Sequence, residues 1–185
     1  MRAMRHTRFV ESEQDLRALD AKALACPHCG LYGTLNVHGW LMGYAEVGPE
    51  RIVRGRRLYC SNRFRRPGCG RTLSVLLADM IAGFIVTTRT LERFARAVVS
   101  GACRKAAWER AAGTELSLRS GYRLWQRLDR AQSALRTRLC RICAPPQTHS
   151  VLPMAQMVAH MSAVFGSAEH ALSRLQRHFQ VSLFD

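Results

Sequence analysis

Apolar residues in the middle of the chain recur at helical spacing and predict consecutive helices. In the first, Leu91, Phe94 and Val98 share one face, and the helix is expected to end at Gly101. The stretch CRKAAWERAAG predicts a second, shorter helix that ends at Gly113. We therefore expect a compact helical unit in this half of the chain.

A third, longer helix begins after Ser117, whose hydroxyl can cap its first turn. One broad side of this helix is apolar and carries Leu118, Tyr122, Trp125, Leu128 and Leu135. A different side is basic and carries Arg119, Arg123, Arg127 and Arg130. Three helices with a turn between the second and third are the helix-turn-helix pattern, in which the third helix enters the DNA major groove. A solvated arginine face on a bundle helix is the alternative interpretation.

The pattern changes before the helices, where two strand-like stretches flank a turn. The two stretches are GTLNVHGWLMGY and ERIVRGRRLYC, and AEVGP separates them. This order predicts a β-hairpin between residues 30 and 60. Ahead of it, Ser12 and Asp15 have the spacing of a capping box and predict a short packing helix.

The C-terminal segment reads as two helices broken at Gly166. The first has an apolar stripe of Met154, Met157, Val158, Met161, Val164 and Phe165, and the second has one of Leu172, Leu175 and Phe179. These stripes either complete the core or form a surface for a homodimer or another partner.

Together these elements predict an α+β fold, mainly α, in which a small β-hairpin precedes a helix-turn-helix bundle and a C-terminal helical hairpin. The expected units are the N-terminal helix at 1–25, the hairpin with its connecting segment at 26–87, the helix-turn-helix at 88–143 and the helical hairpin at 144–185.

The large positive net charge indicates an anionic partner. Lysine and arginine total 28 residues against 13 acidic ones, for a net charge of +15, and 48% of the chain is hydrophobic, enough for a folded core. Arginine forks match phosphate pairs and guanine edges, so nucleic acid is the first candidate.

A membrane location is not expected. The most apolar run, residues 73–88, is shorter than a spanning helix and contains Asp79, so it reads as core. No signal-peptide pattern is evident, and seven cysteines, an odd number, argue against a secreted disulfide framework. We expect a cytoplasmic protein.

The cysteines suggest a metal site. CPHCG at residues 26–30 is followed by CSNRFRRPGCG at 60–70, so that each second cysteine precedes a glycine. Zinc takes four tetrahedral ligands, and two cysteine-bearing turns beside a hairpin can supply them. The predicted Zn²⁺ ligands are Cys26, Cys29, Cys60 and Cys69.

Other ligand sets stay open at this point. His28 and His38 are possible substitutes, the pair Cys140 and Cys143 could replace one of the others, and the four thiols could simply be buried. We expect Cys140 and Cys143 to be buried filler residues near the end of the long helix. Cys103, at a helix start, is expected to be inert.

The order CPxCG, an HG hairpin with an aromatic residue, RRLYC and CGRTLS resembles the zinc ribbons at the front of bacterial insertion-sequence transposases and their small regulatory partners, over residues 24–76. Such ribbons commonly precede a helix-turn-helix, so the resemblance implies DNA binding in a mobile element, with a recombinase or transposase as a possible partner. The wide loop between Cys60 and Cys69 departs from that pattern and adds a basic finger with Arg63, Arg65 and Arg66.

Catalysis is not expected, because the acidic residues form no cluster suited to magnesium, and the chain is too short for a full transposase catalytic domain. The sequence therefore suggests a zinc protein that binds double-stranded DNA of defined sequence, as an accessory or regulatory factor of recombination or transposition or as a transcription regulator. The expected DNA contacts are the four arginines of the long helix, the three of the finger, and Arg56 and Arg57. A structural zinc adaptor for RNA or an acidic protein is the alternative.

Overall fold

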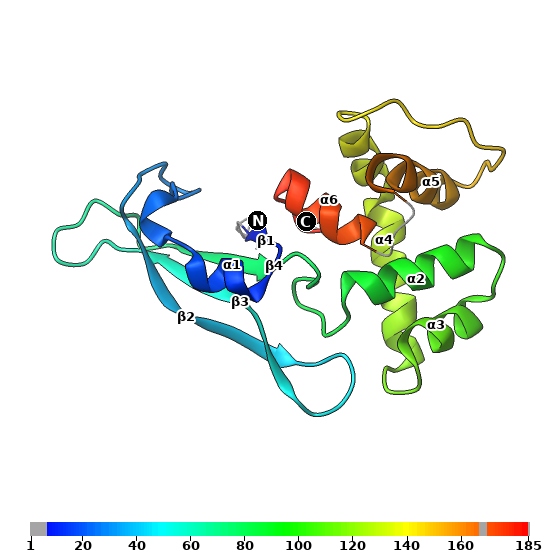
Figure 1. The fold of residues 1–185 in the computed structure, drawn as a ribbon, viewed down its shortest axis with the longest axis horizontal. Coiled ribbons are helices and arrows are strands. Elements are labelled where there is room, and N and C mark those ends of the chain that lie inside the picture. The colour runs from blue at the N-terminus through cyan, green and yellow to red at the C-terminus, as the bar shows by residue number, and fades with distance from the viewer. Residues whose placement is uncertain (1–6, 167–169, 185) are drawn as a thin grey trace.

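The predicted hairpin forms the centre of a four-stranded sheet in the computed structural model, which describes residues 7–166 and 170–184 (Figure 1). Its strands are β2 (Leu35–Tyr44) and β3 (Arg51–Cys60), which pair antiparallel. β4 (Thr72–Leu77) pairs antiparallel with β3, and β1 (Thr7–Val10) joins β4 in parallel. The strand order is β1-β4-β3-β2, so two strands extend the hairpin on one side.

A short helix covers one face of this sheet. Helix α1 (Glu13–Ala18) has the predicted capping box, because the Ser12 side chain accepts from the Asp15 amide and the Asp15 carboxylate accepts from the Ser12 amide. A single 3-10 turn, η1 (Ala21–Ala23), follows. Leu16 of α1 is fully buried in a small core with Leu35, Leu58, Leu73 and Val75 of the sheet.

The helical half contains α2 (Thr88–Val99), α3 (Arg104–Ala112) and α4 (Leu118–Leu139). The predicted ends are confirmed, because Gly101 and Gly113 have positive φ angles after α2 and α3, and Ser117 caps α4. Aromatic rings hold the three helices together. Phe94 lies edge-on to Trp108 and Trp125, with ring centroids 5.2 and 5.7 Å away.

The C-terminal segment forms α5 (Pro153–Phe165) and α6 (Ala171–Phe179), as expected, and α5 ends at Gly166. The apolar stripes of both helices face the core shared with α2, α3 and α4. The stripe residues buried in it are Met154, Met157, Val158, Met161, Leu172 and Leu175, while Val164, Phe165 and Phe179 are partly buried against it. This finding matches the interpretation of the stripes as core. Self-association through α5 and α6 would therefore have to use other residues of these helices.

Helix α6 also connects the helical half to the sheet (Figure 1). The Gln176 side chain is fully buried, and its amide nitrogen donates to the carbonyl oxygens of Ala78 and Met80 while its oxygen accepts from the Leu183 amide. Gln180 pairs in the same way with edge strand β1, accepting from Phe9 N and donating to Phe9 O. The two halves are thus joined by hydrogen bonds from side-chain amides.

Three expectations about α4 and its end need correction. Tyr122 is 41% exposed rather than packed, because Gly121 occupies the packing position, where an added Cβ would lie 2.5 Å from Trp108 Cδ2. Cys140 and Cys143 are exposed, not buried fillers. The helix ends at Leu139, so these cysteines lie in the cap and the following turn, and Leu135 and Leu139 fill the packing side.

No helix in the part of the chain that the structure describes has both the length and the apolar character needed to cross a membrane.

Replacing Gln176 with methionine is expected to destabilise the protein by about 2–4 kcal/mol, because two buried carbonyls and one amide lose their partner while the volume changes little. Urea unfolding of the two proteins measures this difference. The matched control is Arg177→Ala on the exposed side of the same helix, where loss of the surface ion pair with Glu11 should cost less than about 1 kcal/mol. Equal stability losses in the two variants would contradict the role of Gln176.

Candidate metal centre

The structure brings the four predicted cysteines to one point. Their Sγ atoms all lie within 4.8 Å of one another, and the pairs Cys26–Cys69 and Cys29–Cys60 are each 3.7 Å apart. A tetrahedron with metal–sulfur bonds of about 2.3 Å places its sulfur atoms roughly 3.8 Å apart. The same separation is far longer than a disulfide bond of about 2.05 Å. The arrangement therefore fits a four-coordinate metal ion.

The two cysteine turns have the same backbone hydrogen bonds despite their different lengths. In the first turn, Gly30 N donates to Cys26 O at 2.8 Å, and Cys26 N donates to Leu31 O at 2.9 Å. In the second, Gly70 N donates to Cys60 O at 2.9 Å, and Cys60 N donates to Arg71 O at 2.9 Å. Both glycines have a φ near +70°, which explains the shared CG pair.

The wide loop does not distort the second turn because it is closed at its base. Gly68 N donates to Ser61 O at 3.1 Å, which brings the residues before and after the insertion together. Cys69 N then donates to Cys60 Sγ at 3.2 Å. Residues 62–67 therefore form a loop that starts and ends at the Ser61–Gly68 contact. The turn without this loop has five residues, like CPHCG: Cys60, Ser61, Gly68, Cys69 and Gly70.

Burial differs among the four thiols. Cys26 and Cys60 are buried against the sheet core, whereas Cys29 and Cys69 are half-buried. Burial raises the pKa of Cys26 to about 12 and also raises the pKa of Cys69. Burial acts in the same direction on Cys60, but Thr34 Oγ1 at 3.2 Å, the Cys69 amide and the neighbouring thiols lower the pKa of Cys60 to about 7. A bound cation would stabilise all four thiolates.

The other candidate ligands lie outside this cluster. His28 is at its rim, with Nε2 3.4 Å from Thr72 O and Nδ1 3.4 Å from an Arg71 nitrogen. His38 is exposed on β2, with its ring near Tyr59. Cys103, Cys140 and Cys143 are exposed and belong to the helical half. Among the described residues, the four cysteines form the one group with metal-binding geometry.

Some ligand-supporting residues were not predicted. Gly68 was missed because the insertion hides its position as the residue before Cys69, although the PG pair is a turn signal. Thr34, whose hydroxyl lies beside Cys60 Sγ, leaves no sequence signal, since a threonine ahead of a strand is unremarkable.

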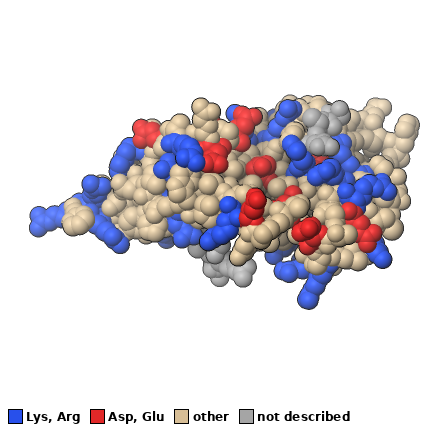
Figure 2. All heavy atoms as spheres, turned by 60° about the horizontal axis from the view of Figure 1, so that its bottom comes forward, with Lys and Arg blue, Asp and Glu red and all other residues tan. Residues whose placement is uncertain are grey.

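The predicted arginines do not form one continuous group. Arg63, Arg65 and Arg66 are exposed in the loop between β3 and β4, at the sheet end of the molecule, while α4 lies in the helical half (Figure 1). Figure 2 shows basic side chains at the narrow sheet end and again over the helical end.

The arginines of β3 and α4 differ in what they contact. Arg57 is exposed, whereas Arg56 is half-buried, with its guanidinium 4.5 Å from the Trp40 ring centroid and donating to Leu16 O at 2.8 Å. The four α4 arginines, Arg119, Arg123, Arg127 and Arg130, are all exposed. Arg127 also lies 4.9 Å from the Phe84 ring centroid.

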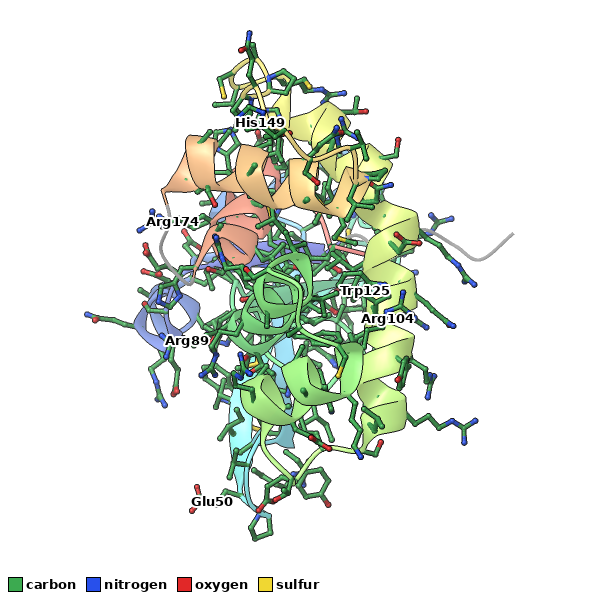
Figure 3. All side chains as sticks on the ribbon, turned by 90° about the vertical axis from the view of Figure 1, so that its right-hand side faces the viewer. Glu50, Arg89, Arg104, Trp125, His149 and Arg174 are labelled. Carbon is green, nitrogen blue, oxygen red and sulfur yellow. The ribbon has the colours of Figure 1, made fainter. Side chains whose placement is uncertain are left out.

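Figure 3 shows Trp125 of α4 turned toward the other helices with Arg104 beside it, while long nitrogen-tipped side chains extend from the outer side of α4. The guanidinium of Arg104 lies 5.3 Å from the Trp125 ring centroid. Helix α4 therefore has a buried apolar side and an exposed basic side.

No family model matches the chain, and no curated protein or solved structure matches it either.

Replacing Gly68 with alanine should weaken metal binding and destabilise the sheet half, because the added Cβ would lie 2.2 Å from Ser61 O and force the base of the loop open. A chelator competition measures the metal affinity, and thermal unfolding measures the stability. The matched control is Gly39→Ala, where the added Cβ meets no atom within 4 Å. Equal metal affinity in the two variants would show that the closed base is not needed for the second cysteine turn.

Proposed function

We propose that this protein is a zinc protein that binds duplex DNA through the basic side of α4. The observation that carries the proposal is the division of α4 into two sides, one buried in the core and one exposed with Arg119, Arg123, Arg127 and Arg130. A chain of net charge +15 attracts polyanions, and arginine forks fit both phosphates and guanine edges.

Zinc is the metal that best fits the donor set. Four thiolates at tetrahedral spacing are typical of structural zinc sites, and the surrounding small core suits a module that is stabilised by its metal. A site with four protein sulfur ligands leaves no open position for substrate, so we assign the metal a structural role. It would hold the ends of β3 and β4 beside the turn that precedes β2.

The helix-turn-helix proposal rests on α3, α4 and the turn between them. Trp108 of α3 packs against Gly121 of α4, and its indole nitrogen donates to Leu116 O at 3.1 Å, which fixes the turn. The first turns of α4 leave Arg119 and Arg123 exposed. In a helix-turn-helix the N-terminal residues of the second helix of the motif contact base edges, so these two arginines are the proposed readers of sequence.

A role in a mobile element is the biological setting that we propose, as an accessory or regulatory factor of recombination or transposition. It is supported by the resemblance of residues 24–76 to insertion-sequence zinc ribbons, and by the geometric match of the cysteine turns to a metal site.

Zinc analysis of the purified protein should find one ion per chain. Cys26→Ser or Cys60→Ser should abolish stoichiometric binding and unfold the sheet half, because a tetrahedral site loses much of its affinity with one ligand and that affinity stabilises the fold. Cys140→Ser and Cys143→Ser are the matched controls, since both thiols are exposed and outside the cluster. Full zinc content after Cys60→Ser, or loss of zinc after Cys143→Ser, would overturn the assignment.

Arg119→Ala or Arg123→Ala should each cost about 1–3 kcal/mol of binding free energy on the preferred DNA site and relax selectivity, as expected for a lost guanine contact. A duplex selected from a random library supplies the preferred site, and titrations against that duplex and a scrambled one at several salt concentrations measure both effects.

The matched control is Arg51→Ala, which removes the same charge from an exposed position at the start of β3. Its affinity should fall little and equally on both duplexes. Unchanged selectivity in the Arg119 and Arg123 variants would exclude α4 as the reader, and tighter binding of the wild type to RNA than to duplex DNA would contradict the proposed function.

A further inference from the structure

Residues 62–67, which we call the finger, have no role in the folded core. All six residues are exposed, and Phe64 at the centre is 95% exposed. The second cysteine turn closes beneath them through Ser61 and Gly68, so the metal geometry does not need them. An apolar ring held in water by a loop that the fold does not require suggests contact with another molecule.

The finger is structured although it projects. The Tyr59 hydroxyl lies 2.6 Å from Asn62 Oδ1, and the Arg63 guanidinium lies 5.7 Å from the centroid of the Tyr59 ring. Arg66 N donates to Arg63 O at 3.1 Å and closes a turn at the tip. These contacts, with the closed base, limit the conformational entropy that the finger would lose on binding.

The backbone at the tip is unusual. Phe64 and Arg65 have φ angles of 53° and 60°, in the left-handed region that residues with a Cβ seldom adopt. At 95% exposure, the Phe64 ring does not pack onto Tyr59 or the sheet, and the finger contains three arginines and no acidic residue.

An apolar ring between arginines matches one kind of DNA contact. Proteins that bend DNA insert an apolar side chain between base pairs from the minor groove, and nearby arginines are attracted by the strong negative potential of that groove. The finger carries both the apolar ring and the arginines on one short, preorganised loop.

We propose that the finger is a minor-groove wedge, in which Phe64 inserts between adjacent base pairs and Arg63, Arg65 and Arg66 contact the flanking phosphates and groove. This inference rests on the proposed binding of duplex DNA by α4. The finger projects from the sheet end and α4 lies in the helical half, so the two would contact separate parts of a site (Figure 1). A kink at the wedge allows a duplex to follow more of the protein surface.

The test uses the full-length zinc-loaded protein and duplexes with 2-aminopurine at successive positions, whose fluorescence rises where a base is unstacked. Fluorescent labels at the duplex ends report bending. The wild type should unstack one step and bend the duplex. Phe64→Ala should remove the fluorescence rise and the bend and weaken binding by about tenfold, in the range of one lost stacking contact.

Two further variants distinguish the contribution of the Phe64 ring from that of the arginine charge. Phe64→Leu should restore most of the unstacking, because leucine also acts as a wedge. Arg65→Ala should keep the unstacking but reduce the slope of log affinity against log salt by roughly one. Deletion of 62–67 should keep one zinc per chain, since Ser61 then precedes Gly68 directly in a turn of CPHCG length, and should lose the bend.

The possible failures can be told apart. If the wild type binds duplex selectively through α4 but Phe64→Ala leaves fluorescence and bend unchanged, the wedge is wrong and the proposed function stands. If Phe64→Ala weakens binding to single strands only, the finger stacks on unpaired bases, and the wedge is again wrong. If the wild type binds no duplex, the proposed function and the wedge both fail.

Discussion

The convergence of four cysteine sulfurs is the constraint on which the sheet half depends. The apolar core beneath it is small, with Leu16, Leu35, Leu58, Leu73 and Val75 as its main buried residues, and two of the thiols are part of that core. Without a cation, the thiol pairs 3.7 Å apart, each of one buried and one half-buried cysteine, contribute only weak contacts. With one, the turn before β2, the end of β3 and the segment before β4 are tied together. The insertion of residues 62–67 is tolerated because Ser61 and Gly68 close its base, so extra length is added without moving the ligands.

Features set by neighbouring residues could be predicted from the sequence, and features set by distant residues could not. The capping box at Ser12, the helix ends at Gly101 and Gly113 and the hairpin all depend on local chemistry, and all are observed. The pairing of β1 with β4 joins Thr7 to Ser74, and a four-residue strand carries too little pattern to reveal such a partner. The burial of Gln176 between the two halves is equally invisible, because an isolated glutamine on a helix ordinarily indicates a solvated position.

In the candidate site, too, local features could be predicted from the sequence and features set by distant residues could not. The repeated CG pair identified the four cysteines, since each glycine supplies the backbone angle that its turn needs. The error at Cys140 and Cys143 has a physical cause: helical periodicity was extended past Leu139, where no glycine or proline marks the end of α4. Periodicity also placed Tyr122 on the apolar side, but the close approach of Trp108 leaves room only for Gly121 there. At Tyr122 the deciding factor was tertiary packing, which a local pattern does not contain.

Net charge alone does not identify a binding surface, and the arginines of β3 show why. Arg56 and Arg57 are adjacent, yet alternation along a strand sends them to opposite faces of the sheet. Arg56 is used within the fold, over Trp40 and against the carbonyl of Leu16, while Arg57 stays exposed. The exposed arginines of α4 and of the finger are separated by the length of the sheet and by the junction that Gln176 and Gln180 hold (Figure 1). A junction that keeps the two basic surfaces in a fixed relation favours their joint action on one duplex, because a free hinge would add an entropic cost to the second contact. The side-chain amides of Gln176, buried within α6, and of Gln180, exposed just after it, therefore connect the stability of the fold to the proposed mode of DNA binding.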